Sequence, residues 1–185
     1  MIYFASTRFN NETWEEHEAY RKKRAIDGCI YGNRQMIQHK IPSHILMFVI
    51  EMNNSTNKIE GIGLIRNTVC TDRYYKIYDN GDFNRYTYKG KYRLGREQLL
   101  RFNSKIVSNL DHVLFKGKTH LKRLPGISIV PEKLLKHERC ADIDMKKEIE
   151  NAFIAEFKKV QVQVQVEVEV EPPIDLELEL ELERK

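Results

Sequence analysis

The chain has 185 residues, of which 41% are hydrophobic and 31% charged, and its formal net charge is +4. This composition is typical of one globular domain with a charged surface, and the length suits one domain with a tail better than two domains. No apolar run approaches the roughly 20 residues that cross a bilayer, and the first residues lack a signal-peptide pattern, so we expect an intracellular protein, in the cytoplasm or nucleus, without a membrane partner.

The charge is distributed unevenly along the chain. Residues 160–185 contain eight acids and two bases, a balance of −6, which leaves +10 on residues 1–159. We therefore predict a single α+β domain over 1–159 and a low-complexity acidic tail over 160–185. A basic body with an acidic tail fits a polyanionic partner, RNA or DNA, although basic residues also serve solubility alone. We expect the Val-Gln and Leu-Glu repeats of the tail to be disordered or weakly ordered; an added edge hairpin and a self-associating strand are the alternatives.

The first half of the chain predicts six elements in order: a strand over 1–6, a surface helix over 11–24 with Asn11 as N-cap, a short extended segment over 29–31, a short helix over 34–39, and strands over 45–52 and 58–66. The last two are near-continuous apolar runs joined by the turn-forming residues 53–57, which indicates a β-hairpin. Gly61 and Gly63 weaken the second strand unless a bulge, sharp coiling or a close neighbour requires them. We interpret them as the coiled wall of a barrel.

The second half predicts a further hairpin, one long helix and three shorter elements: strands over 74–78 and 84–88, a helix over 97–115, a strand over 127–130, a helix over 132–137 and an amphipathic helix over 144–159. Residues 68–96 alternate aromatic and basic side chains, which suits nucleic-acid binding because cations neutralise phosphates and flat rings stack on bases. Alternating tyrosines are also simply good strand formers. For backbone phosphates we select eight cations: Arg73, Arg85, Lys89, Lys91, Arg93, Lys118, Lys122 and Arg123.

No complete enzyme motif is present in the sequence. The histidines are scattered and the three cysteines are far apart, so we predict no metal site, no disulfide framework and no cofactor. We expect a non-catalytic protein. The alternative is a nucleic-acid-processing enzyme, a metal-dependent nuclease or a base hydrolase, that would use Asp72, Asp79 or Asp82. A further alternative is an assembly protein that associates through its tail.

Three stretches carry a family resemblance: the segment GNRQM at 32–36 before the strand ILMFVIEM, the returning strand KIEGIGLIRN, and the closing stretch HLKRLPGISIVPEKLLK. In this order they resemble the PUA-like superfamily, most closely its EVE and YTH branch, over about residues 1–137. The sequence departs from the EVE pattern where Pro42-Ser43-His44 replaces a Gly-Asp turn. In general style the chain is also similar to proteins of large DNA viruses.

The PUA-like resemblance implies a fold and a site. The fold would be a small curved, mostly antiparallel β-barrel with surrounding helices. The site would be a pocket for a flipped and often modified nucleobase near the ends of the first strands. By position, six residues would approach it: Ser6, Thr7, Trp14, Tyr31, Asn33 and Arg34. Trp14 and Tyr31 are then candidates for stacking, and Asn33 for hydrogen bonding to a base edge.

Overall fold

The computed structural model describes residues 2–38 and 41–168. The chain divides into two units, Met1–Phe153 and Ile154–Lys185. The described part of the second unit, 154–168, is the later portion of a single helix. No helix in the described ranges is long and apolar enough to cross a membrane.

A five-stranded mixed sheet forms the centre of the first unit, with the order β6-β4-β3-β1-β7. Its strands are β1 (Tyr3–Phe9), β3 (Leu46–Asn53), β4 (Lys58–Arg66), β6 (Tyr92–Gly95) and β7 (Ser128–Ile129). β1 and β3 are parallel, and the other neighbours are antiparallel. A separate ribbon pairs β2 (Cys29–Asn33) with β5 (Tyr86–Gly90).

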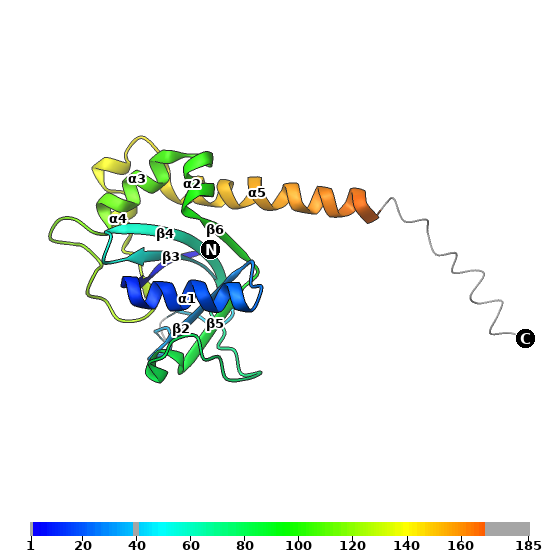
Figure 1. Cartoon of the computed structure of the whole chain (residues 1–185). Coiled ribbons are helices and arrows are strands. Elements are labelled where there is room, and N and C mark those ends of the chain that lie inside the picture. Colours follow the sequence, from blue (N-terminus) through cyan, green and yellow to red (C-terminus); the bar gives the residue numbers. More distant parts are fainter. Residues whose placement is uncertain (1, 39–40, 169–185) are drawn as a thin grey trace, which may run out of the picture. The chain divides into compact units, whose positions relative to one another are not determined.

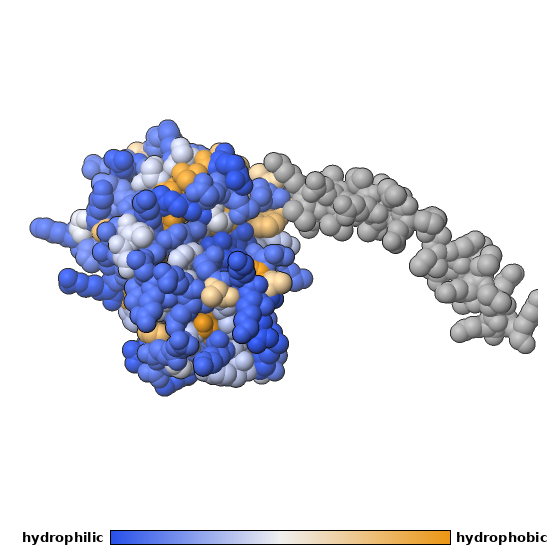
Figure 2. All heavy atoms as spheres, viewed as in Figure 1, coloured by the Kyte–Doolittle hydropathy of each residue, from blue (hydrophilic) through white to orange (hydrophobic). Residues whose placement is uncertain are grey.

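Both faces of the sheet are covered, which explains why β3 is apolar along nearly its whole length. One face packs on the β2–β5 ribbon and on α1 (Asn11–Lys23), in a core that includes Val49 and the fully buried Tyr31. On the other face Phe48 contacts Phe153 of α5 (Met145–Val168), with ring centroids 4.8 Å apart. The helices α2 (Arg96–Phe102) and α3 (Ser104–Val113) lie beside β4 on this side (Figure 1). The visible surface of the compact unit is mostly hydrophilic (Figure 2).

Gly63 is required by a close approach between the sheet and the ribbon. A Cβ at this position would lie 2.2 Å from the Tyr31 hydroxyl oxygen and 2.6 Å from the Cys29 sulfur. At Gly61 a Cβ would lie 2.6 Å from the Leu94 carbonyl oxygen. Of the explanations that the sequence offered, close neighbours account for both glycines, because a side chain at either position would separate packed elements.

The central hairpin and most of the other predicted elements are confirmed. β3 and β4 pair across the 53–57 turn with a register shift between Glu51 and Met52. The first strand and the first helix form, although the helix N-cap is Asn10 and not Asn11. The closing elements also form, as the short strand β7, α4 (Glu132–Leu135) and α5. A 3-10 turn at Glu138–Cys140, which was not predicted, lies between α4 and α5 in the chain.

The predicted hairpin of 74–78 and 84–88 is wrong. Residues 74–78 form no strand, Gly81–Asn84 is a 3-10 helix, and β5 pairs with β2. The cause is the buried Asn84 side chain, which accepts hydrogen bonds from the backbone amides of Ile77 and Tyr78, both at 2.9 Å, and donates to the Tyr78 carbonyl at 2.6 Å. These contacts use the backbone groups that a partner strand would have satisfied.

Two helix predictions also need correction. The helix expected over 97–115 is two helices, because Asn103 has extended backbone and its side chain accepts from the Lys105 amide, which starts α3 anew. Of the helix expected over 34–39, the described residues 34–38 are not helical.

The α+β class is confirmed, but the sheet is not closed into a barrel. Within the described residues β6 and β7 are its two edges, and the β2–β5 ribbon covers one face without joining the ladder. The backbone of 160–168 continues α5 as helix instead of the strand that its alternating pattern would favour. The rest of the predicted acidic tail, 169–185, lies outside the described residues, and so does any self-association through it.

Candidate functional site

A cavity of about 830 Å³ lies where β1 and β2 both end. Its wall comes from five segments: the end of β1, the first turns of α1, residues 32–35 around the end of β2, residues 78–80 with Phe83, and the loop 124–126. Asn54 of the hairpin turn lies at one side. The volume is within the usual range for sites that hold small molecules. The cavity belongs entirely to the first unit.

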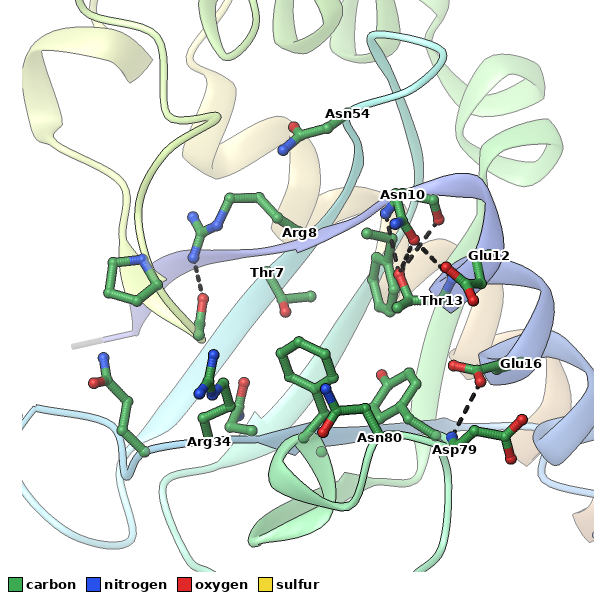
Figure 3. Close-up of a pocket in the computed structure, with 18 of the residues that line it drawn as sticks. Thr7, Arg8, Asn10, Glu12, Thr13, Glu16, Arg34, Asn54, Asp79 and Asn80 are labelled. Carbon is green, nitrogen blue, oxygen red and sulfur yellow. Dashed lines mark hydrogen bonds between the residues drawn. The ribbon is translucent and has the colours of Figure 1, made fainter.

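Arg8 of β1 is the half-buried cation of the cavity (Figure 3). Its guanidinium donates to the carbonyl oxygen of Gly126. It also donates to the hydroxyl oxygens of Ser6 and Ser128, both at 3.3 Å. None of the ion pairs within the described ranges includes Arg8. Burial lowers the pKa of Arg8 to about 10, which still leaves it charged at neutral pH. The cavity therefore contains a cation whose protein partners are neutral.

Two amide side chains leave hydrogen-bonding atoms unused at the cavity wall. Asn33 is 3% exposed and its Nδ2 has no partner among the described groups. Asn54 donates to the Lys122 carbonyl at 3.0 Å, but its buried Oδ1 is likewise unpaired. A buried polar atom without a partner costs free energy, so a bound group or water that paired with these two atoms would recover that cost.

One aromatic ring is placed for stacking. Phe83 lines the cavity and is half-buried, with the Arg34 guanidinium 5.7 Å from its ring centroid. Tyr78 lies edge-on to Phe83 at 6.0 Å and lines the same wall. Arg34 is exposed and ion-paired with Asp82 at 3.1 Å.

The cavity brings together half of the residues predicted for a base pocket. Thr7, Asn33 and Arg34 line it, whereas Ser6, Trp14 and Tyr31 do not. Ser6 is fully buried in β1. Trp14 is half-buried and packs edge-on to Phe9, with ring centroids 5.1 Å apart.

Tyr31 has no accessible ring for stacking, since it is fully buried and its hydroxyl donates to Glu51 at 2.8 Å. Glu51 also accepts from Arg93, at 2.6 Å for Nη2 and 2.9 Å for Nε. The Arg93 side chain is 10% exposed and Glu51 is 0% exposed. Arg93 is therefore committed to a buried ion pair and unsuited to contact a phosphate.

The other predicted phosphate ligands form two groups. Arg85 follows the cavity segment 78–83, and Lys122 and Arg123 precede the cavity residue Leu124 in the chain. Arg73 and Lys89 instead lie against the Tyr75 ring, at 5.0 and 4.8 Å from its centroid.

Lys89 and the exposed Lys91 are at the far end of the β2–β5 ribbon, because the Asn33 end of β2 pairs with Tyr86. Lys118 is exposed in the connector after α3. Of these cations, only Arg85, Lys122 and Arg123 are within two residues, along the chain, of a residue that lines the cavity.

Sequence reasoning missed Arg8, Asn54 and Phe83. Arg8 had a signal, because a charged residue inside an otherwise buried strand requires a partner or a function. Phe83 had none, since its position depends on the 3-10 turn that replaces the expected hairpin.

The acids that an enzyme would use have different surroundings in the structure. Asp79 lines the cavity, but Asp72 accepts from the Tyr75 hydroxyl at 2.6 Å, and Asp82 is paired with Arg34 and Arg85. The part of the chain that the structure describes contains no group of three or more His, Cys, Asp or Glu residues that could hold a metal.

No protein-family model matches the chain, and no curated protein or solved structure is significantly similar to it. The PUA-like resemblance therefore stays a prediction, and the function has to be argued from the cavity.

Proposed function

We propose that the protein binds nucleic acid, RNA or DNA, without catalysis, and holds one unstacked base in the cavity between β1 and β2. The observation that carries the proposal is the buried amide of Asn33, a residue that lines the cavity and whose nitrogen has no partner among the described groups. A base edge supplies the acceptor that this donor lacks. A stacked base in a duplex cannot enter such a pocket, so the substrate is single-stranded or has a flipped base.

The surroundings of Asn33 support this proposal. The half-buried Phe83 ring offers a stacking surface, and stacking on an aromatic ring contributes about 1–3 kcal/mol per base. Backbone phosphates of the nucleic-acid strand would lie near four cations that belong to the cavity segments or are close to them in the chain: Arg34, Arg85, Lys122 and Arg123. The PUA-like architecture is part of the same proposal, supported by the order of the matching stretches, with an open sheet in place of a closed barrel.

The first experiment measures binding of short single-stranded RNA and DNA to the full chain by fluorescence anisotropy at low salt. We expect binding that weakens as salt is raised, because phosphate contacts release counterions. A chain that lacks residues 160–185 should bind more tightly, since the acidic tail competes with phosphate. If neither protein binds RNA or DNA at low salt, the proposal fails.

A matched pair of variants tests the site itself. Asn33→Leu removes the unpaired amide of the cavity, and we expect affinity to fall about 10-fold or more, because losing one buried hydrogen bond costs about 1–3 kcal/mol. Asn109→Leu is the control: Asn109 is also buried, its Nδ2 is also unpaired, and it does not line the cavity. Equal effects of the two substitutions would count against a base in this cavity.

A further inference from the structure

The charges around the cavity are separated by sign (Figure 3). Arg8 and Arg34 lie on one side, and Glu12, Glu16 and Asp79 lie on the other. No ion pair within the described ranges connects the two sides, since Arg34 pairs with Asp82 and Arg8 is bonded to neutral oxygens. A ligand that spans the cavity therefore meets donors and positive charge at one end and carboxylates at the other.

The acidic side is not explained by helix stability alone. Glu12, in the first turn of α1, complements the helix dipole. Glu16 is four residues later on the same helix face, where a like charge is unfavourable. Its Oε1 accepts from the Asp79 backbone amide at 3.0 Å, so α1 and the Asp79 loop meet at this side of the cavity. Three acidic residues thus belong to one side of the cavity, and none of them is in an ion pair among the described residues.

Asn33 belongs to the opposite side. A Cβ on Gly126 would be 3.4 Å from its Oδ1, and Gly126 is the residue whose carbonyl accepts from Arg8. Asn33 is 3% exposed and its nitrogen is unpaired among the described groups, which is an observation independent of the acids. A base carbonyl would supply the acceptor that this nitrogen lacks, on the side where Arg8 and Arg34 favour negative charge.

We propose that the base held in the cavity carries a positive charge on its ring: an alkylated, cationic nucleobase with a carbonyl acceptor toward Asn33 and its charged edge toward Glu12, Glu16 and Asp79. This inference rests on the proposed function and specifies its substrate class. A neutral base leaves the three carboxylates without a counter-charge, whereas a cationic base neutralises them while its phosphate lies toward the arginines.

The test compares isomeric bases at the centre of otherwise identical single-stranded RNA oligonucleotides, with the full chain and at fixed salt. One pair is 3-methylcytidine, which is cationic, and 5-methylcytidine, which is neutral; both keep the O2 carbonyl. The other pair is 7-methylguanosine, which is cationic, and N2-methylguanosine, which is neutral; both keep the O6 carbonyl. We expect each cationic isomer to bind about 10-fold more tightly, as several partly exposed charge contacts together would provide.

Variants then assign the preference to the acids. Glu12→Gln combined with Asp79→Asn should reduce the preference for the cationic isomer, measured as the ratio of the two affinities, to about 3-fold or less. Glu15→Gln, an exposed acid of the same helix that does not line the cavity, is the control and should leave the preference intact.

The outcomes separate the two proposals. Equal affinity for the isomers in both pairs overturns the cationic base and leaves base binding standing. A preference that survives the double substitution also overturns it. Absence of binding to every oligonucleotide overturns both the cationic base and the proposed function.

Discussion

The buried pair of Glu51 and Arg93 permits a sharp test of the packing between the sheet and the β2–β5 ribbon. Arg93→Met keeps most of the side-chain volume but removes the charge and the hydrogen bonds of 2.6, 2.9 and 3.1 Å to the carboxylate. Glu51, which is 0% exposed, then keeps only the Tyr31 hydroxyl as a hydrogen-bonding side-chain partner among the residues that the structure describes. Breaking one side of a buried ion pair costs about 3–5 kcal/mol, and we expect a loss of this size in the free energy of unfolding at pH 7.

The same substitution should reverse the sign of one pH dependence. Burial by itself raises the pKa of Glu51, but the charge and hydrogen bonds of Arg93 outweigh burial and hold the pKa below its ordinary value of 4.5. In the parent protein this carboxylate therefore stabilises the fold above that value, and the contribution is lost as the pH falls toward the folded pKa. Without Arg93 burial dominates and raises the pKa, so the stability deficit of the variant should shrink as the pH is lowered from 7 to 5.

Urea unfolding at pH 7 and pH 5 measures both effects, and a thermal scan should show a midpoint lower by roughly 6–20 °C at pH 7. Arg85→Met is the matched control, because Arg85 pairs with Asp82 at the surface, with side chains 60% and 43% exposed. We expect that control to lose less than about 1 kcal/mol. A loss below about 1 kcal/mol for Arg93→Met, or a deficit that grows on acidification, would refute the description of this pair.

Two further substitutions test the same interior. Gly63→Ala should lower the free energy of unfolding by about 1–3 kcal/mol, because the added methyl group would overlap the Tyr31 hydroxyl. Gly81→Ala is the control and should not lower it, because the nearest neighbour of its methyl group would be 3.9 Å away. Urea titrations of the two variants measure the difference. Burial, the largest cause, lowers the pKa of His17 below 6.5, so the unfolded chain binds the proton first and stability falls as the pH drops below about 6.5, by at most about 1.4 kcal/mol per pH unit. His17→Gln should flatten that part of the curve of unfolding free energy against pH, and an unchanged slope would show that His17 is not buried in its neutral form.

Local signals were sufficient for the elements whose partners are close in the sequence. The hairpin of β3 and β4 follows from two apolar runs and a polar turn, and the helices α1 and α5 follow from their periodicity and charge order. The α+β class follows from the same elements.

The failures arise from side chains that bond to the backbone and from pairing between distant strands. Asn84 and Asn103 redirect the chain by bonding to backbone amides, and no periodicity shows this. β5 pairs with β2, more than fifty residues earlier in the chain, where no turn sets the register.

The site was predictable only in part for the same reason. Thr7, Asn33 and Arg34 were expected from the PUA-like resemblance to approach one pocket, and all three line the cavity at the ends of β1 and β2. Trp14 and Tyr31 were placed at the pocket by position and assigned to stacking by residue type, but the same residue type is equally suited to a core, where Tyr31 is found. Arg8 is held by the carbonyl of Gly126, more than a hundred residues later in the chain, and Phe83 joins the cavity wall from a loop far from β1 in the sequence. A linear pattern contains neither relation.

The pairing of β1 with β7 has a consequence for synthesis of the chain. β1 is complete after Phe9, but its outer edge is satisfied only when Ser128 and Ile129 arrive and the Val130 amide donates to Phe4 at 2.8 Å. Until then the nascent chain exposes the free edge of β1, whose unpaired backbone groups can pair with strands of other chains. This edge of the sheet is therefore covered only late in synthesis. A chain interrupted before residue 128 should be the aggregation-prone species in a cell.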